Sequence, residues 1–365
     1  MSSRAEHRDR MERLRNAIGQ TDLDGVVIVP GPNMRYYTGV NSFLLERPFL
    51  LLVPGEGEAR LVAPAIEAGP YRDSSLDIKV EAWTDSEGPS EAIGRAVSGL
   101  RTKRWGVEGR APFQYISVLG KRMHASLEDA EPTLQGQRAV KDDNEVRLMK
   151  KSARILSAVI AESPGLVRSG MTELDLAAKI ADLIRARGAL SSSDLLVQSG
   201  VRAANPHSIA SKKKIRVGEP IVLDLVSNFE GYHADITRTI AVGNVPGLEE
   251  LYEKVLSAQS KAIAAAARGV AVGEVDKAAR DELKRSGLAR YFTHRTGHGL
   301  GLEEHEAPYI VDGGKQRLEE NMFFTVEPGA YMSGRIGVRI EDDIRVEGSG
   351  VAAITDPPKE FGWWK

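Results

Sequence analysis

The stretch IVLDLVSNFEGYHADITRT, residues 221–239, carries the most informative pattern in this chain. Asp224 ends the apolar run Ile221–Leu223, and Asp235 precedes the run Ile236–Arg238. The pattern predicts a β-hairpin that carries one acid on each strand. A carboxylate buried beside an apolar run needs a cation or several hydrogen bonds to compensate its charge. The hairpin is therefore expected to place two acids at a site that supplies such compensation.

A second copy of this pattern lies about a hundred residues further along the chain. Glu327 stands 103 residues after Asp224, and Glu341 stands 106 residues after Asp235. A helix start is repeated as well, as ELDLAA at 173–178 and EVDKAA at 274–279. We therefore expect two related α/β halves, each donating a pair of acids from a β-hairpin. Approximate twofold symmetry would bring the two pairs together at the centre.

The helices of the two copies carry matching start and stop signals. Thr172 suits the N-cap of the first helix, and Gly188 and Gly287 suit the left-handed position that ends each helix. Longer helices are expected before each copy, at about 143–163 and 248–268.

His298, in RTGHGLG (295–301), joins the four acids as a fifth candidate metal ligand. A single acid at a strand end is usually solvated, and a glycine-flanked histidine is more often a turn residue than a ligand. Two buried acids at repeat-related positions weigh against that interpretation. Four carboxylates and one imidazole suit Mn²⁺, Co²⁺ or Zn²⁺, and a water held between two such ions is a hydrolytic nucleophile. The predicted metal ligands are Asp224, Asp235, His298, Glu327 and Glu341.

Composition restricts the other classes of function. A chain of 365 residues is expected to form two domains, and we predict a small α/β domain at 1–133 and a second domain at 134–365. The polar stretch 131–145 is the predicted linker. The net charge of −2 gives no case for nucleic acid, and the absence of cysteine excludes disulfides and a thiol nucleophile. Without a signal-peptide pattern or a membrane span, the cytoplasm is the expected location.

Three further motifs carry less chemistry. GHGLG (297–301) departs from the dinucleotide-binding pattern. The basic run SKKKIR (211–216) is expected to be solvated, with attraction of an anionic substrate terminus as the alternative. Trp363 and Trp364 are expected to pack on the surface or at a subunit contact.

The motifs resemble the metallopeptidase family with the pita-bread fold, which includes methionine aminopeptidase, aminopeptidase P and prolidase. The resemblance covers essentially the whole chain, and GPNMRYYTG (31–39) and RAVKDDNEVRLM (138–149) are similar to the proline-specific branch. It implies an α+β architecture: a pita-bread catalytic domain with pseudo-twofold symmetry, preceded by the smaller α/β domain. It also implies a homodimer.

The resemblance implies a role for each ligand. Asp224 would bind one of two divalent ions per subunit, and His298 and Glu327 would bind the other. Asp235 and Glu341 would bridge both. Glu327 would also take the proton of the attacking water and pass it to the departing proline nitrogen.

Further catalytic positions follow from the same resemblance. His207, His294 and His305 fall at positions that bind substrate and stabilise the transition state. Arg339 would anchor the site by pairing with an acid, and Thr237 would support the ligands.

The implied activity is hydrolysis of the Xaa-Pro bond in a dipeptide or short peptide, as in Xaa-Pro dipeptidase. Aminopeptidase P and a proline-releasing carboxypeptidase are the alternatives, followed by a creatinase-like metal-free hydrolase and a non-catalytic binding scaffold. Three departures bear on this choice: Leu225-Val226 follow the first ligand in place of x-Gly, Ala234 replaces a serine, and Tyr309 stands where prolidases often carry an arginine. That arginine helps to hold the dipeptide carboxylate, so Tyr309 argues against strict dipeptidase specificity unless Arg339 or the basic run compensates.

Overall fold

The computed structural model describes residues 4–72, 76–192 and 195–364. The chain divides into two compact units, residues 1–138 and 139–365. The expected boundary after residue 133 lies five residues earlier, within α6 (Glu131–Ala139). The boundary falls within the stretch 131–145 that is predicted as linker and boundary, but α6 and the start of α7 (Asp143–Glu162) make most of this stretch helical. Leu134 and Ala139 are buried and give this otherwise polar stretch enough apolar anchorage to form a helix.

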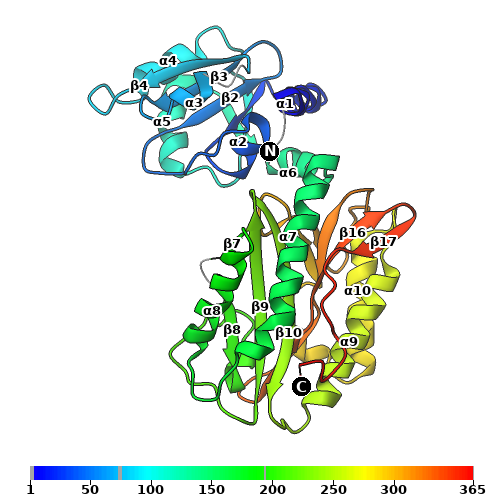
Figure 1. The fold of residues 1–365 in the computed structure, drawn as a ribbon. Helices are drawn as coiled ribbons and strands as arrows, with labels where there is room; N and C mark the ends of the chain where they lie inside the picture. Colours follow the sequence, from blue (N-terminus) through cyan, green and yellow to red (C-terminus); the bar gives the residue numbers. More distant parts are fainter. Residues whose placement is uncertain (1–3, 73–75, 193–194, 365) are drawn as a thin grey trace. The chain divides into compact units, whose positions relative to one another are not determined.

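The N-terminal unit is built on a six-stranded sheet with the order β4-β3-β2-β1-β5-β6 (Figure 1). The central strand β1 pairs antiparallel with β2 and parallel with β5. The expected apolar runs at 25–30, 49–53 and 60–63 correspond to β1, β2 and β3. The strands are β1 Gly25–Ile28, β2 Leu50–Pro54, β3 Ala59–Pro64, β4 Ile78–Trp83, β5 Arg104–Val107 and β6 Ser126–Asp129.

The helices of this unit complete the α/β architecture expected from the sequence. In α1, Met11, Leu14 and Ile18 are buried, as their helical spacing predicts. The helices are α1 Arg4–Gly19, α2 Pro32–Thr38, α3 Gly69–Arg72, α4 Ser90–Val97, α5 Phe113–Met123 and α6 Glu131–Ala139.

The C-terminal unit consists of two related halves, as the repeat predicts. Figure 1 shows the long strands of the first half beside α7 and α8, and α9 and α10 over the second half. The first half contains α7 Asp143–Glu162, η1 Ser163–Leu166, α8 Glu173–Ala186, β7 Leu190–Ser191, β8 Leu196–Ser199, η2 Gly200–Ala204, β9 Glu219–Phe229 and β10 Tyr232–Val242. The second contains α9 Leu248–Ala265, α10 Val272–Arg285, η3 Ala289–Tyr291, β11 Gly297–Gly299, β12 Glu306–Ile310, β13 Phe323–Val326, β14 Gly329–Met332, β15 Ile336–Arg339, β16 Asp342–Glu347 and β17 Gly350–Ala353.

The hairpin of β9 and β10 has one face for the core and one for the candidate site. Asp224 lies opposite Thr237, and Asp235 lies opposite Val226. Because paired residues and alternate residues of a strand share a face, these four side chains project from the same side. The other face, which includes Leu223 and Leu225, belongs to one core cluster with residues of α7 and α8.

The second pair of acids sits on a modified version of this hairpin. Glu327 directly follows β13 and Glu341 directly precedes β16, and these two strands pair antiparallel. The expectation of a simple hairpin is wrong here, because the two-stranded β14–β15 ribbon is inserted between them. The insertion has a consequence for the site, since β15 ends at Arg339.

The ends of the repeated helices follow the sequence signals. Thr172 caps α8 in a capping box with Asp175, and Gly188 and Gly287 take φ values of 85° and 75°. The helix expected at 248–268 ends at Ala265, because Ala266 is already extended.

Two surface expectations can also be compared with the structure. Trp364 packs within the chain, with its ring 5.0 Å from the ring of Phe361. Across the described ranges, no helix has both the length and the apolar character that a bilayer crossing requires.

Candidate metal centre

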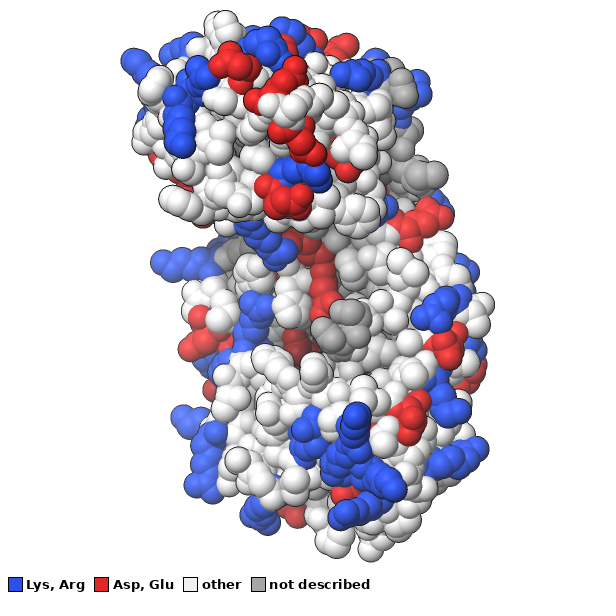
Figure 2. Space-filling model, turned by 90° about the vertical axis from the view of Figure 1, so that its left-hand side faces the viewer, with Lys and Arg blue, Asp and Glu red and all other residues white. Residues whose placement is uncertain are grey.

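A cavity of about 810 Å³ in the C-terminal unit collects every site residue predicted from the sequence. Figure 2 shows acidic side chains gathered in a hollow on one face of this unit, with lysine and arginine on the surface around it. The side chains come from both halves of the repeat, and the fold brings the two halves together at the cavity. The nine predicted residues in its wall are His207, Asp224, Asp235, His294, His298, His305, Glu327, Arg339 and Glu341.

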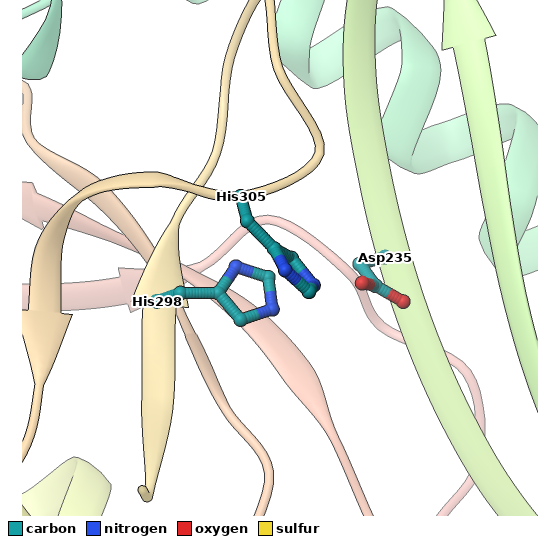
Figure 3. Close-up of side chains that lie close together, drawn as sticks. All are labelled: Asp235, His298 and His305. Atoms are coloured by element: carbon teal, nitrogen blue, oxygen red, sulfur yellow. The ribbon is translucent and has the colours of Figure 1, made fainter. Parts of the chain in front are cut away.

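The ligating atoms form overlapping groups of the size that a metal ion requires. Asp224, Asp235 and Glu341 offer oxygens within 4.8 Å of one another, and a ring nitrogen of His298 lies equally close to oxygens of Glu327 and Glu341. Asp235 also forms a group with His298 and His305 (Figure 3). Asp235, His298 and Glu341 each belong to two groups, and of these three only the carboxylates have two oxygens with which to contact two ions.

Buried oxygens without partners test whether these residues fit metal ions. Asp235 Oδ1 and Glu341 Oε1 are buried and accept no hydrogen bond within the described part of the chain. Burial raises the pKa of both carboxyls well above the usual range, and the neighbouring acids raise it further. Divalent cations would compensate both the unpaired oxygens and the repulsion. The donor set therefore fits the oxygen-rich dinuclear site implied by the sequence.

Glu327 and His298 form the other end of the cluster. Glu327 Oε1 lies 3.3 Å from His298 Nε2. Burial raises the pKa of Glu327 to about 7, and burial together with His305 keeps the pKa of His298 well below its usual value. His298 Nδ1 lies 3.1 Å from the Gly299 carbonyl oxygen. Since a carbonyl only accepts, Nδ1 carries the proton and Nε2 keeps its lone pair for a cation.

The glycines beside His298 serve strand packing. His298 lies in the short strand β11 and is not the turn residue that a glycine-flanked histidine more often is. A Cβ at Gly297 would lie 1.9 Å from the Thr325 carbonyl oxygen, and one at Gly299 would lie 2.2 Å from the Ala307 carbonyl oxygen. Close approach of neighbouring backbone therefore requires both glycines.

Arg339 and Thr237 contact the carboxylates of the site and support their positions. Arg339 is buried and pairs with Asp224, and its Nε donates to Thr237 Oγ1 at 3.2 Å. Thr237 Oγ1 in turn donates to Glu341 Oε2 at 2.5 Å. Arg339 thus pairs with an acid as expected, but with this pairing it is not available to hold a substrate carboxylate.

The three additional histidines differ in their surroundings. His294 Nδ1 lies 2.7 Å from the Arg295 carbonyl oxygen, and its Nε2 lies 2.9 Å from the Tyr331 hydroxyl. Burial lowers the pKa of His294 to about 4, with Arg339 as the next cause, so the ring is neutral and both nitrogens are engaged. His207 and His305 are exposed to the cavity. The ring centroids of His298 and His305 are 3.9 Å apart.

Sequence reasoning missed several groups at the site. Tyr331 joins His294 to Arg339, whose Nη1 donates to its hydroxyl at 2.9 Å, and a lone tyrosine in a strand gives no signal of this role. Arg295 and Glu304 also line the cavity, and both stand next to or near histidines that the sequence did single out. The remaining wall is largely apolar and includes Leu195, Leu196, Pro206, Ile209 and Val226.

The basic run at 211–216 lies outside the cavity wall. Lys213 Nζ lies 2.7 Å from Glu219 Oε2, so this lysine has a structural partner. The run therefore does not compensate for the arginine that Tyr309 replaces.

Comparisons with known proteins agree with this geometry. The model of metallopeptidase family M24 matches residues 147–348, and that of the creatinase/prolidase N-terminal domain matches residues 10–140. The chain belongs to metallopeptidase family M24, with the pita-bread catalytic fold and the preceding creatinase-type domain that the sequence predicts.

Two solved structures and one curated relative are similar over nearly their whole lengths. The dipeptidase PepE of Mycobacterium ulcerans has a TM-score of 0.93 and 34% identity, covering 99% of this chain and 98% of its own. The prolidase of Thermococcus sibiricus has a TM-score of 0.92 and 32% identity, covering 99% of both chains. An Xaa-Pro dipeptidase of Pyrococcus horikoshii is 31% identical over 97% of this chain and 98% of its own.

The buried acids predict that the metal-free protein becomes less stable as pH rises. The folded-state pKa of Glu327 is raised to about 7 from 4.5, so its contribution is fully present below about 4.5 and is lost as pH rises through 7. Asp235 and Glu341 are shifted in the same direction. His298, whose folded-state pKa is lowered, adds no further change above its unfolded value of 6.5.

Thermal unfolding of chelator-treated protein at pH 6.5 and 8.5 measures this effect. The melting temperature is expected to fall between these pH values without metal, and added Mn²⁺ should raise it more at pH 8.5. A metal-induced shift that is equal at both pH values would contradict the electrostatic account.

Replacing Thr237 with valine tests the support of Glu341. Thr237→Val keeps the side-chain shape but removes the hydrogen bonds to Glu341 and Arg339, so Mn²⁺ affinity should fall about 10- to 100-fold. Thr239→Val is the matched control, because Thr239 lies on the same strand and bonds only the Arg339 backbone. Calorimetric titration that gives the two variants the same affinity would show that Thr237 does not support the ligand.

Proposed function

We propose that this protein is a metal-dependent Xaa-Pro dipeptidase. The observation that carries the proposal is the convergence, in one cavity, of four repeat-related acids, two of which (Asp235 and Glu341) each have one buried oxygen without a hydrogen-bond partner among the described residues. The prolidase and Xaa-Pro dipeptidase that resemble the chain over nearly its full length support the choice of substrate.

Two divalent cations per subunit, chosen among Mn²⁺, Co²⁺ and Zn²⁺, are part of the proposal. Asp224 would hold one ion, His298 and Glu327 the other, and Asp235 and Glu341 both, in line with the overlapping groups of carboxylate oxygens and imidazole nitrogens. When bound, the ions supply Lewis acidity that activates water and polarises the scissile carbonyl.

Proton transfer is assigned to Glu327. Its position supports this role, because Oε1 lies 3.3 Å from His298 Nε2 in the cavity, where a carboxylate can exchange a proton with a water held at the site. It would accept the proton of the attacking water and deliver it to the proline nitrogen, which leaves as an amine.

The histidines take different roles in this proposal. His207 and His305 face the cavity and would donate hydrogen bonds to the carbonyl oxygen as negative charge develops there. His294 has both nitrogens engaged. We therefore assign it to positioning Tyr331 and, through Tyr331, Arg339, in place of the direct catalytic role expected from the sequence.

The apolar wall suits the proline ring. Leu195, Leu196 and Val226 line the cavity together with the acids, and burial of a pyrrolidine ring against such side chains is favourable. A pocket of this kind favours a tertiary amide over an ordinary peptide bond.

A substrate-length series tests the proposed activity. With Mn²⁺ present, Ala-Pro is expected to release proline, whereas Ala-Pro-Ala and Ala-Ala-Pro should react at least about tenfold more slowly, a difference of about 1.4 kcal/mol in the barrier. Prolonged treatment with a chelator should abolish turnover, and Asp235→Ala should do the same while the protein remains folded by circular dichroism.

Each alternative has its own signature in this series. Preferred cleavage of Ala-Pro-Ala would indicate an aminopeptidase, and preferred proline release from Ala-Ala-Pro a carboxypeptidase. Turnover that survives chelation would indicate a creatinase-like mechanism. No hydrolysis of any peptide with any of the three metals would favour the binding scaffold.

The homodimer and the cytoplasmic location stay predictions. Light scattering after size-exclusion chromatography checks the first, and fractionation of the source cells checks the second.

A further inference from the structure

The cavity contains two charged side chains that are not predicted metal ligands and that pair with no other charged group of the described chain. They are Arg295 and Glu304, both in the cavity wall. Within the described residues, neither side chain has a hydrogen bond or an ion pair with another group. Charged groups in protein cavities are usually paired, because desolvation without a partner costs free energy. Two unpaired and opposite charges beside a hydrolytic centre therefore suggest a ligand that carries both charges.

Arg295 is supported by an aromatic ring. Its guanidinium carbon lies 4.5 Å from the centre of the Tyr309 ring, and contact with a ring face stabilises the cation without using its N–H donors. Tyr309 therefore does not leave this part of the cavity without positive charge. Arg295 lines the same cavity as Glu327 and His298 and stands three residues before His298 in the chain.

Glu304 is carried by a segment that a buried ion pair fixes. Lys141 Nζ lies 2.7 Å from Glu306 Oε1, and both side chains are almost fully buried. The second oxygen of Glu306 accepts from the Glu303 backbone N–H at 3.3 Å. This anchorage holds the backbone on both sides of Glu304 in place.

The surroundings of Glu304 favour a cation. Burial raises the pKa of its carboxyl, and the negative charge of Asp224 raises it further. The charge of Glu304 also acts on Asp235. Glu304 and Arg295 line the same cavity and stand on either side of His298 in the chain.

Resting on the proposed dipeptidase function, we propose that Arg295 and Glu304 are the residues that make the enzyme specific for a zwitterionic dipeptide. Arg295 binds the carboxylate of the proline, and Glu304 binds the α-ammonium group of the residue before it. The scissile bond then lies between the two charges, over the metal ligands. A longer peptide cannot pair with both Arg295 and Glu304 at once. Beside one of these two residues it presents an amide in place of the terminal carboxylate or ammonium group.

Three substrates that differ by one charged group test this assignment. Ala-Pro carries both charges, Ala-Pro amide lacks the carboxylate, and N-propanoyl-proline lacks the ammonium group without added bulk. The kcat and KM of each are measured with Mn²⁺ for the wild type, Arg295→Gln and Glu304→Gln.

Each variant is expected to lose the preference for one of the two charged groups of the substrate. Arg295→Gln should lower kcat/KM for Ala-Pro about 10- to 100-fold, mainly through KM, and leave Ala-Pro amide nearly unchanged. Glu304→Gln should lower Ala-Pro by a similar factor and leave N-propanoyl-proline nearly unchanged. Arg295→Lys and Glu304→Asp should retain a large part of each preference because they keep the charge.

Matched controls separate recognition from general effects of charge. Arg290→Gln removes an arginine that also stacks on a tyrosine, with its guanidinium carbon 4.7 Å from the ring centre of Tyr291. Glu319→Gln removes an exposed glutamate. Neither residue lines the cavity, so neither change should alter the preference for charged substrates.

Several outcomes would overturn the proposal. An equal loss on all three substrates, or a large loss of Mn²⁺ affinity by calorimetry in Glu304→Gln, would assign these residues to the metal centre instead. Unaltered preferences in both variants would show that neither residue recognises charge. Failure of the wild type to cleave Ala-Pro would reject the dipeptidase function itself, and this result is visible before any variant is made.

Discussion

The structure depends on the compensation of negative charge at the centre of the C-terminal unit. The four predicted acidic ligands and the neutral imidazole of His298 lie in one cavity, and two of their carboxylate oxygens are buried without a hydrogen-bond partner among the described residues. Arg339, the one arginine buried among the predicted site residues, pairs with Asp224 and cannot neutralise the rest. Divalent cations are the compensation that fits this donor set. The repeat of the fold serves this purpose, because each half contributes acids from adjacent antiparallel strands.

Support for the acids comes from the same strands that carry them. Thr237 lies opposite Asp224 in the hairpin and reaches Glu341 of the other half, so one hydroxyl joins the two repeats. The inserted β14–β15 ribbon brings Tyr331 and Arg339 to the same place. The second half of the repeat thus departs from simple symmetry at the ribbon. The ribbon supplies the guanidinium group of Arg339 and the hydroxyl of Tyr331 next to the carboxylates.

Substrate specificity is proposed to depend on cavity residues other than the metal ligands. Tyr309 raised a question from the sequence alone, because it replaces an arginine expected in prolidases. In space the Tyr309 ring supports Arg295, a residue fourteen positions earlier in the chain. On our proposal, the positive charge is retained while its place in the sequence changes. The opposite charge of Glu304 would then complete a site for a molecule with two charged ends.

The sequence alone was enough to predict the ligand types, the two-part organisation and the repeated hairpin strands. An acid beside an apolar run, and a second copy of it about a hundred residues later, can be read directly from the sequence. It missed the helix at 131–139, where two buried apolar side chains outweigh a polar composition, and the inserted ribbon. Only the tertiary structure decided that His294 is engaged with Tyr331, that Arg339 is committed to Asp224, and that Arg295 stacks on Tyr309. These contacts join residues distant in the chain, and no local pattern encodes which side chains the folded sheets bring face to face.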